Sequence, residues 1–371
     1  MEIKQYPFYL KSTVILFGLI LFTYILLNLQ DILIPIAFAL IISILLNPLY
    51  VRFTHLKIPK VLAIMLTLII ALVFMSAIFY FLSSQIIKLG ETLPVLKEKF
   101  SALLVELQQW LQSNFGLTIQ KQIQLLNEGV DSNKALVGRT LGSVLGIVGI
   151  LLLLPVYIFL FLFYKPLIVN FLFEVFAEEN SKKVKAVLGQ TKSAIQSYII
   201  GLLIEAIIVA ALNTTALLIL GVEYAILLGV IGALLNMLPY VGGIVAIILP
   251  VLMATVTEDG YTTQLGIVGA YALIQFIDNN ILVPRIVSSK VQINALVSIL
   301  VVLLGGALWG LSGMFLSIPT IAVMKIIFDR VEDLKPWGKL IGDEIPTRHM
   351  GAIWGKRKHS PSLAEKIVKG N

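Results

Sequence analysis

Apolar residues along this chain gather in long runs, and polar residues fill the segments between the runs. Six runs have the length of a helix that crosses a bilayer, which needs roughly 20 apolar residues. We therefore predict six transmembrane helices, at residues 12–29, 32–49, 61–82, 141–164, 198–220 and 264–283. The second run contains Pro35, which predicts a kink there.

Two further apolar stretches are interrupted at their middle by glycine, proline or asparagine. The first, 224–256, is interrupted between Asn236 and Gly243, and the second, 294–328, between Gly305 and Gly313. Each stretch is too long for one membrane-spanning helix and too short for two, so we predict a re-entrant helix hairpin in each. The alternative is a pair of short, tilted spans in each stretch, which would give about eight transmembrane helices.

The distribution of Lys and Arg predicts the topology. These residues precede the first predicted span and follow the second, fourth and sixth, whereas the alternating turns carry Asp31, Glu223, Glu258 and Asp259 without Lys or Arg. Cytoplasmic loops are enriched in Lys and Arg, so we predict that both termini are cytoplasmic. The first hairpin would then enter the membrane from outside and the second from the cytoplasm, as an inverted pair.

The composition agrees with an all-α, polytopic integral membrane protein. Residues of the set AVILMFWYC make up 58% of the chain and charged residues 13%, whereas soluble domains have roughly 25% charged residues. Lys4 and Lys11 precede the first run and no small-residue cleavage site follows it, so we predict an uncleaved first span. The chain has no cysteine, which excludes disulfides and thiolate catalysis. Its net charge of +7 follows the topology signal, so we expect no nucleic-acid partner.

These features divide the chain into five regions. We predict N-terminal transmembrane helices at 1–83, an extracytoplasmic amphipathic insert at 84–140, the fourth span with a cytoplasmic helical linker at 141–197, a transport core with two broken-helix hairpins at 198–334, and a cytoplasmic basic tail at 335–371. The insert has apolar residues at helical spacing. Its helix would pack on the membrane surface or its own bundle, or would associate between protomers.

Glu205 is the first candidate for chemistry, because it lies inside the fifth predicted span. An ionisable side chain in a membrane helix is costly unless it is neutral, paired or in contact with water, so it is a functional candidate. A carboxyl group that is removed from water favours its protonated form, which suits a group that binds and releases a proton. The alternative is a protonated glutamic acid with a structural hydrogen bond and no role in transport.

A second group of polar residues lies on one face of the sixth predicted span. Gln275, Asp278 and Asn279 are spaced i, i+3 and i+4, so they share that face. Carboxylate and amide oxygens beside broken backbone are what a sodium ion or a proton-coupled polar substrate needs. The structural alternative is an ion pair between Asp278 and Arg285.

The tips of the two predicted hairpins complete the candidate substrate-binding or ion-binding site. Glycine permits tight turns and proline removes a hydrogen-bond donor, so carbonyl groups freed from the helices could line a site there. The candidates at the tips are Asn236, Pro239, Gly242, Gly305 and Gly306. We predict no cofactor and no metal centre.

Three motifs in the second half resemble the autoinducer-2 exporter (AI-2E) family of permeases. They are the run Leu238-Pro239-Tyr240-Val241-Gly242, the run QFIDNNILVPR from Gln275 to Arg285, and the glycine-rich segment from Gly305 through Trp309 to Pro319. The resemblance implies a polytopic, oligomeric permease of the bacterial cell membrane. It also implies export of the furanone quorum signal or, in other branches, sodium/proton exchange. One departure is Asn294-Ala295, where many members carry a proline.

Transport is therefore the leading functional hypothesis. We expect a secondary carrier, coupled to H⁺ or Na⁺, that exports a small polar metabolite or a signal such as autoinducer-2. Its partners would be the lipid bilayer, the substrate and further copies of the chain. The alternatives are a Na⁺/H⁺ antiporter, a channel and a non-transporting scaffold. An intramembrane enzyme is disfavoured, because His55, His349 and His359 fall outside the predicted spans and Asp278 has no aspartate partner within them.

Overall fold

The computed structural model describes residues 7–115, 153–175, 181–238, 242–258, 260–287 and 293–343. These residues are almost entirely helical. Within the described ranges, seven helices are long and apolar enough to cross a membrane. The predicted class, an all-α polytopic membrane protein, is therefore confirmed. Each of the six predicted spans overlaps one of these helices, and the seventh is the second interrupted stretch.

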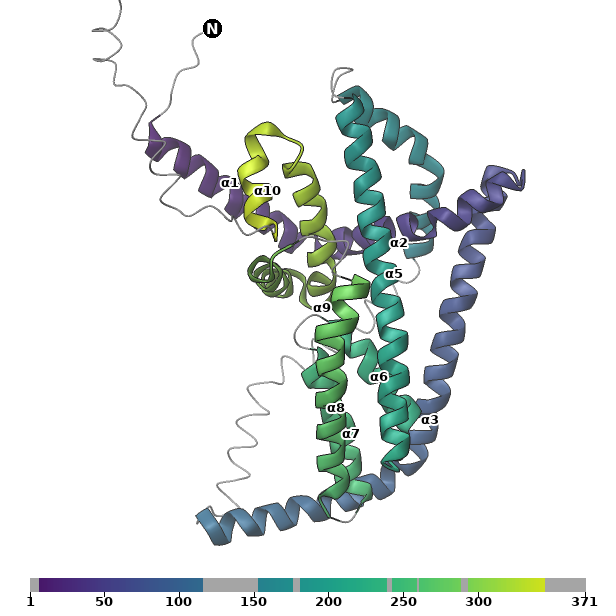
Figure 1. Cartoon of the computed structure of the whole chain (residues 1–371), viewed down its shortest axis with the longest axis vertical. Helices are drawn as coiled ribbons and strands as arrows, with labels where there is room; N and C mark the ends of the chain where they lie inside the picture. The colour runs from purple at the N-terminus through teal and green to yellow at the C-terminus, as the bar shows by residue number, and fades with distance from the viewer. Residues whose placement is uncertain are drawn as a thin grey trace, which may run out of the picture.

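Helix α1 (Phe8–Asn28) leaves almost all of its described side chains exposed. It is followed after a single residue by α2 (Gln30–His55) and lies at the side of the molecule (Figure 1). The side chain of Trp309 holds its C-terminal end, because the indole Nε1 donates a hydrogen bond of 3.0 Å to the carbonyl oxygen of Leu26. The last carbonyl groups of a helix need such external donors when the helix ends.

Helix α3 (Lys60–Phe115) is continuous over 56 residues. The predicted boundary at residue 83 therefore falls inside a helix, and the described part of the predicted insert is helical. Pro94 lies within α3, and the final part of the helix runs across the bottom of the molecule in Figure 1. A proline inside a helix removes one hydrogen bond and favours such a bend. Residues 116–152, which include the rest of the insert and the start of the predicted fourth span, lie outside the described residues.

The next described helix, Leu153–Val175, packs with α2 and α3 in an apolar cluster. The buried residues of this cluster are Ala39, Ile64, Leu68, Ile158 and Leu162. Apolar burial does not drive helices together in lipid as it does in water, so close packing of complementary surfaces holds these helices.

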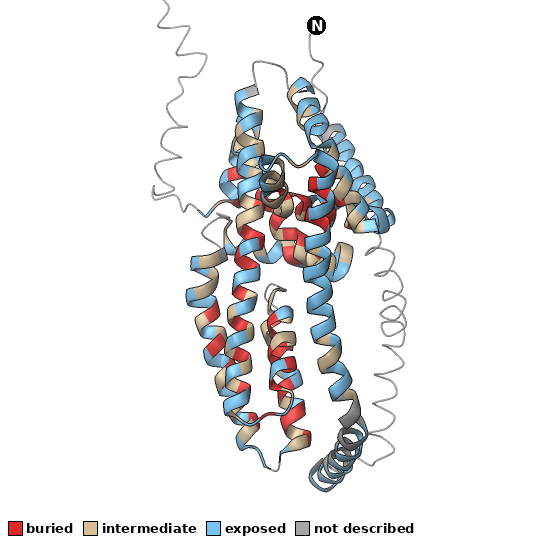
Figure 2. Cartoon of the chain, turned by 90° about the vertical axis from the view of Figure 1, so that its right-hand side faces the viewer, coloured by how far each residue is buried: buried red, intermediate tan, exposed pale blue. Residues whose placement is uncertain are grey.

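The central column of the molecule consists of α5 (Ser181–Ile219), α6 (Ala225–Asn236), α7 (Gly242–Thr257), α8 (Thr262–Ile277) and the π-helix η2 (Asp278–Val287). Figures 1 and 2 show α5 and α8 side by side along the long axis, with buried residues on their inner faces. Helices α6 and α7 pack against each other, so the stretch 224–256 forms a helix hairpin. Its helices end and restart at Asn236 and Gly242, within the predicted interruption.

Helix α9 (Ala295–Phe328) also folds back on itself. Its backbone leaves the helical conformation at Trp309 and Gly310, where Gly310 has φ 58° and ψ −139°, a conformation available essentially only to glycine. The two halves then contact each other, because Ser317 Oγ donates a hydrogen bond of 2.8 Å to the carbonyl oxygen of Val301. The stretch 294–328 is thus a second hairpin. The side of the membrane from which each hairpin enters stays a prediction.

The start of α9 contacts the described part of the predicted tail, residues 335–343, which contains α10 (Lys335–Ile341). The short helix η4 (Glu332–Leu334) directly precedes α10. The side-chain nitrogen Nδ2 of Asn294 donates to the carbonyl oxygens of Leu340, Ile341 and Gly342 at 2.7, 3.0 and 3.1 Å. Its Oδ1 accepts a hydrogen bond of 3.0 Å from the backbone N–H of Val297 and so caps α9. One side chain therefore joins the second hairpin to α10.

Candidate functional site

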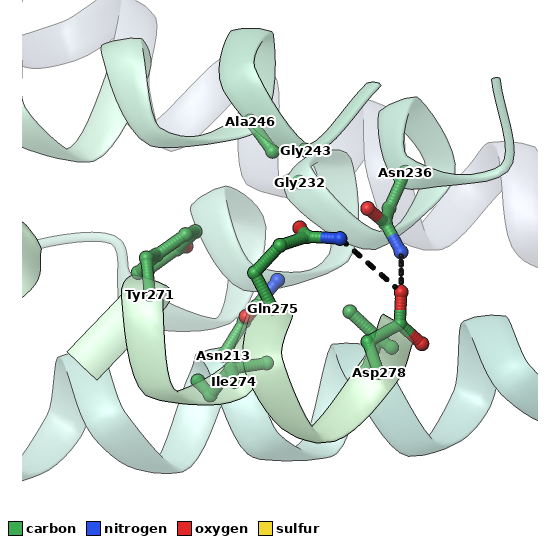
Figure 3. Close-up of a pocket in the computed structure, with 10 residues that line it drawn as sticks. Asn213, Gly232, Asn236, Gly243, Ala246, Tyr271, Ile274, Gln275 and Asp278 are labelled. Carbon is green, nitrogen blue, oxygen red and sulfur yellow. Dashed lines mark hydrogen bonds between the residues drawn. The ribbon is translucent and has the colours of Figure 1, made fainter. Parts of the chain in front are cut away.

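Asp278 lies where α8 changes into the π-helix η2. Its side chain is 2% exposed, and its Oδ2 accepts hydrogen bonds from Asn236 Nδ2 at 2.9 Å and from Gln275 Nε2 at 3.4 Å (Figure 3). The structure thus brings together three of the predicted site residues, one of them from the end of the first half of the hairpin. Segments of π-helix are rare and are found frequently at functional sites.

A small cavity lies beside this cluster, between the four helices α5 to α8 and the start of η2. Its volume is about 10 Å³, which is the space that one water molecule needs. The residues lining it are Val209, Asn213, Gly232, Asn236, Gly243, Ala246, Tyr271, Ile274, Gln275 and Asp278. The cavity therefore has room for a single small ion or water molecule and not for an organic molecule.

Two glycines allow polar groups to approach the cavity from both sides. A Cβ atom at Gly243 would overlap Gln275 Oε1 and would lie 3.2 Å from Asn236 Oδ1. A Cβ atom at Gly232 would lie 3.2 Å from Asn213 Nδ2 and 3.6 Å from the Tyr271 hydroxyl oxygen. A Cβ atom is therefore excluded at Gly243 by the present position of Gln275, whereas at Gly232 it would make one tight contact. Figure 3 shows the polar side chains that approach these two glycines.

Several oxygen atoms of this site lack a hydrogen-bond partner among the described residues. They are Asp278 Oδ1, Asn213 Oδ1 and the Tyr271 hydroxyl oxygen, all of them buried. An unsatisfied buried polar group costs about 1–3 kcal/mol, and such groups are rare unless water, an ion or a ligand binds them. An oxygen-rich site with one carboxylate is suited chemically to a small cation or a proton.

Glu205 lies next to this site without lining the cavity. It is 5% exposed, and its Oε2 has no hydrogen-bond partner among the described residues. It interacts electrostatically with Asp278, across the contact between α5 and η2. The site therefore contains two neighbouring buried carboxyl groups.

The remaining predicted residues lie farther from the cavity. Asn279 is exposed, and its Oδ1 accepts a hydrogen bond of 3.3 Å from Gln275 Nε2. Gly242 is buried against the backbone of Leu235. Gly305 and Gly306 do not line the cavity and instead pack against the second half of α9, at Gly313 and Met314. Pro239 lies outside the described residues.

The sequence analysis did not single out Asn213, Gly232 or Tyr271, and it placed Gly243 only in the hairpin interruption. Tyr271 precedes Gln275 and Asp278 at the spacing i, i+4 and i+7, which puts the three on one helix face and could have indicated it. Asn213 is a polar residue in an apolar span, and this too is a signal of function.

Comparison with known proteins assigns a family. A sequence model described as "AI-2E family transporter" matches residues 13–333. The chain belongs to the AI-2E transporter family. The resemblance seen in the sequence motifs is thereby confirmed, now across nearly the whole chain.

Three relatives illustrate the range of AI-2E proteins to which the chain is similar. The "AI-2 transport protein TqsA" of Escherichia coli (strain K12) is 26% identical over 320 residues, which cover 84% of this chain and 90% of TqsA. The "Putative transport protein YueF" of Bacillus subtilis (strain 168) is 27% identical over 311 residues, with 79% of this chain and 82% of YueF covered. The "Putative transport protein YhhT" of E. coli (strain K12) is 25% identical over 330 residues, with 85% and 89% covered.

Membership in the AI-2E family and the seven long apolar helices agree on the class of function. The protein is a multi-pass membrane transporter whose surroundings are a lipid bilayer. Its relatives are named as transport proteins and permeases.

Proposed function

We propose that this AI-2E protein is a secondary carrier that exports a small polar metabolite or signal and is driven by a cation gradient. The observation that supports this proposal best is the buried carboxylate of Asp278, held by Asn236 and Gln275 at the interruption of the first hairpin. Broken helices that meet a carboxylate inside the membrane form the ion and substrate sites of many secondary transporters.

The size of the cavity supports a role in binding the coupling ion. A volume of about 10 Å³ holds one ion or one water molecule, so an exported organic molecule would need a different arrangement of the hairpins. The same size supports a second candidate function, Na⁺/H⁺ exchange, in which the ion itself is the transported species. A scaffold without transport activity would have no use for two buried, neighbouring carboxyl groups.

Autoinducer-2 is the first substrate to test, because the relative TqsA is named as an AI-2 transport protein. We also propose that the protein resides in the bacterial inner membrane, with both termini cytoplasmic, as the loop charges predict. The proposal further includes assembly into a homo-oligomer, the absence of catalytic activity, and the division of the chain into the five regions predicted from the sequence.

Flux measurements in proteoliposomes test the proposal. Purified protein is reconstituted, proton or sodium gradients are imposed, and the movement of synthetic autoinducer-2 and of ²²Na⁺ is followed. We expect gradient-driven flux of at least one of the two, and loss of that flux in Asp278→Asn, which keeps the shape of the side chain and removes its charge.

Glu223→Gln is the matched control, because it removes a carboxylate from the exposed turn before α6. This variant should transport like the wild type. Wild-type vesicles that move neither probe under any gradient would contradict an ion-coupled carrier, and Asp278→Asn with full flux would remove Asp278 from the coupling site.

A further inference from the structure

The buried polar atoms that lack a partner are confined to two facing helices. Within the described residues there are six such side-chain atoms, and every one belongs to α5 or to the continuous helix formed by α8 and η2. They are Thr191 Oγ1, Glu205 Oε2, Asn213 Oδ1, Gln264 Oε1, the Tyr271 hydroxyl oxygen and Asp278 Oδ1.

These residues also share a register. Gln264, Tyr271 and Asp278 follow each other at intervals of seven residues, and a helix drifts only about 20° per heptad, so all three lie on one face of α8–η2. Glu205 and Asn213 lie on the face of α5 that meets this helix, because Asn213 lines the same cavity as Tyr271 and Glu205 interacts with Asp278. We call these five residues the polar seam.

The polar seam extends from the N-terminal end of α8 to the carboxyl groups of Glu205 and Asp278. Gln264 lies near the N-terminus of α8, and 14 residues separate it from Asp278, which corresponds to about 21 Å along a helix. The polar groups form three levels, roughly 10 Å apart. At hydrogen-bonding distances of about 2.8 Å, a proton path would need two or three water molecules to bridge each interval. The cavity beside Asp278 has room for one of them, so the others would enter only when the two helices separate slightly.

We propose that the polar seam is a proton path from the extracytoplasmic face to the Glu205–Asp278 pair. This proposal rests on the proposed carrier function and on the predicted topology, and it deepens them by naming the proton as the coupling ion. A proton moves along hydrogen-bonded water between the levels and binds to one of the unpartnered carboxylate oxygens, Glu205 Oε2 or Asp278 Oδ1. Two carboxylates on packed helices repel each other when both are ionised, so a proton that binds to either one relieves this repulsion.

The path ends at this pair because the next part of α5 is apolar. Tyr198, Ile199 and Leu202 pack there with Ile41 of α2 and Leu316 of α9 in a buried cluster. Thr191, the sixth unpartnered residue, lies beyond this cluster on α5. The apolar cluster therefore separates the carboxyl pair from the cytoplasmic side, as alternating access requires.

Few other titratable groups belong to the helices around the pair. Helices α6 and α7 contain none, and α8 contributes only Tyr271. On α5, Tyr198 interacts with Glu205, and on η2, Arg285 follows Asp278 by seven residues. The remaining groups on the helices packed against α5 are Lys325 of α9, which pairs with Asp329, and Asp31, Tyr50, Arg52 and His55 of α2.

Cysteine substitution tests whether water reaches the polar seam, because the native chain contains no cysteine. A silver ion is similar in size to a hydronium ion, and it reacts with thiol groups that water can reach. Gln264→Cys and Asn213→Cys are expressed singly. Leu273→Cys is the matched control, since Leu273 lies on α8 at the depth of the cavity and is 61% exposed on the outer surface. Leu202→Cys is a second control, within the buried apolar cluster. Right-side-out membrane vesicles are treated with silver nitrate, and the thiols left free are counted with a maleimide after denaturation.

We expect silver applied from outside to block the thiols of Gln264→Cys and Asn213→Cys, and to leave those of Leu273→Cys and Leu202→Cys free. A free thiol at Asn213→Cys would overturn the proposal, and so would equal blocking at Leu273→Cys. If Asn213→Cys is not inserted into the membrane, Tyr271→Cys, which lines the same cavity, decides the outcome in its place.

Proton uptake identifies the transported ion and separates this proposal from the carrier function. Proteoliposomes that contain a pH-sensitive dye receive a potassium diffusion potential, and uptake is compared between wild type, Tyr271→Phe and Glu205→Gln. We expect slower uptake in Tyr271→Phe, which loses only the hydroxyl group, and loss of uptake in Glu205→Gln. Uptake without any autoinducer-2 or ²²Na⁺ flux would contradict the carrier and leave the proton path standing. Substrate flux with no proton uptake would overturn the proton path and leave the carrier standing.

Discussion

Gly243→Ala changes the candidate site by a single methyl group. The added Cβ would overlap Gln275 Oε1 and would lie 3.2 Å from Asn236 Oδ1. Gln275 has a flexible side chain and can rotate away, but it then loses its hydrogen bond to Asp278. We therefore expect the variant to be inserted normally, since alanine is also the better helix former by about 0.5–1 kcal/mol, and to bind the coupling proton more tightly, because the ionised carboxylate loses a hydrogen-bond donor.

The size of the effect follows from the lost hydrogen bond. Hydrogen bonds to charged groups contribute about 1.5–3 kcal/mol. Because 1.4 kcal/mol corresponds to about a tenfold change in affinity, the half-saturating concentration of the coupling proton should fall by about 10- to 100-fold. The assay is the ion dependence of flux in proteoliposomes.

A double-mutant cycle and a matched control make the reasoning refutable. Gly269→Ala places the same methyl group on α8, where a Cβ atom has no neighbour within 4 Å, and it should leave the ion dependence unchanged. If Gly243→Ala acts by displacing Gln275, it should add little in a Gln275→Ala background. Wild-type ion dependence in Gly243→Ala, or an undiminished effect of that substitution in the Gln275→Ala background, would refute the reasoning.

Three further predictions concern the fold. Gly310→Ala should destabilise the protein by about 1–3 kcal/mol, because φ 58° and ψ −139° strain any residue with a Cβ atom, and scanning fluorimetry in detergent should show a lower melting temperature than for the Gly269→Ala control. Asn294→Ala should release α10 from the start of α9, so trypsin should cleave that region faster; an unchanged cleavage rate would show that the three hydrogen bonds to the tail carbonyls are dispensable. An impermeant thiol reagent applied to intact cells should label Ser113→Cys and spare Lys182→Cys, and the reverse pattern would invert the predicted topology.

Local sequence signals predicted the cluster around Asp278 better than the cavity beside it. Gln275 and Asp278 are a turn apart on one helix, and Asn236 occurs where an apolar run is interrupted, so each could be found from its own segment. Asn213 and Tyr271 meet only because α5 and α8 pack together, 58 positions apart in sequence. The spacing within one helix cannot reveal which helix faces it.

The interruptions differ in how closely their position could be predicted. The first lies between Asn236 and Gly242, where proline and two glycines coincide. The second segment carries four glycines between Gly305 and Gly313, and only the backbone shows that Gly310 makes the turn while Gly305 contacts Gly313. Glycine permits both a turn and a close helix contact, so composition alone cannot separate the two uses. The length of α3 was also not predicted, because polar residues that leave the membrane continue the same helix.

The hydrogen bond between Trp309 and Leu26 has a consequence for biogenesis. The two residues are 283 positions apart in the chain, and ribosomes add roughly 5–20 residues per second. The first transmembrane helix therefore waits about 15–60 s after its own synthesis before the residue that fastens its end exists. During that interval α1 can contact α2, which follows it directly in the chain, whereas its contact with α9 can form only after nearly the whole bundle has been synthesised.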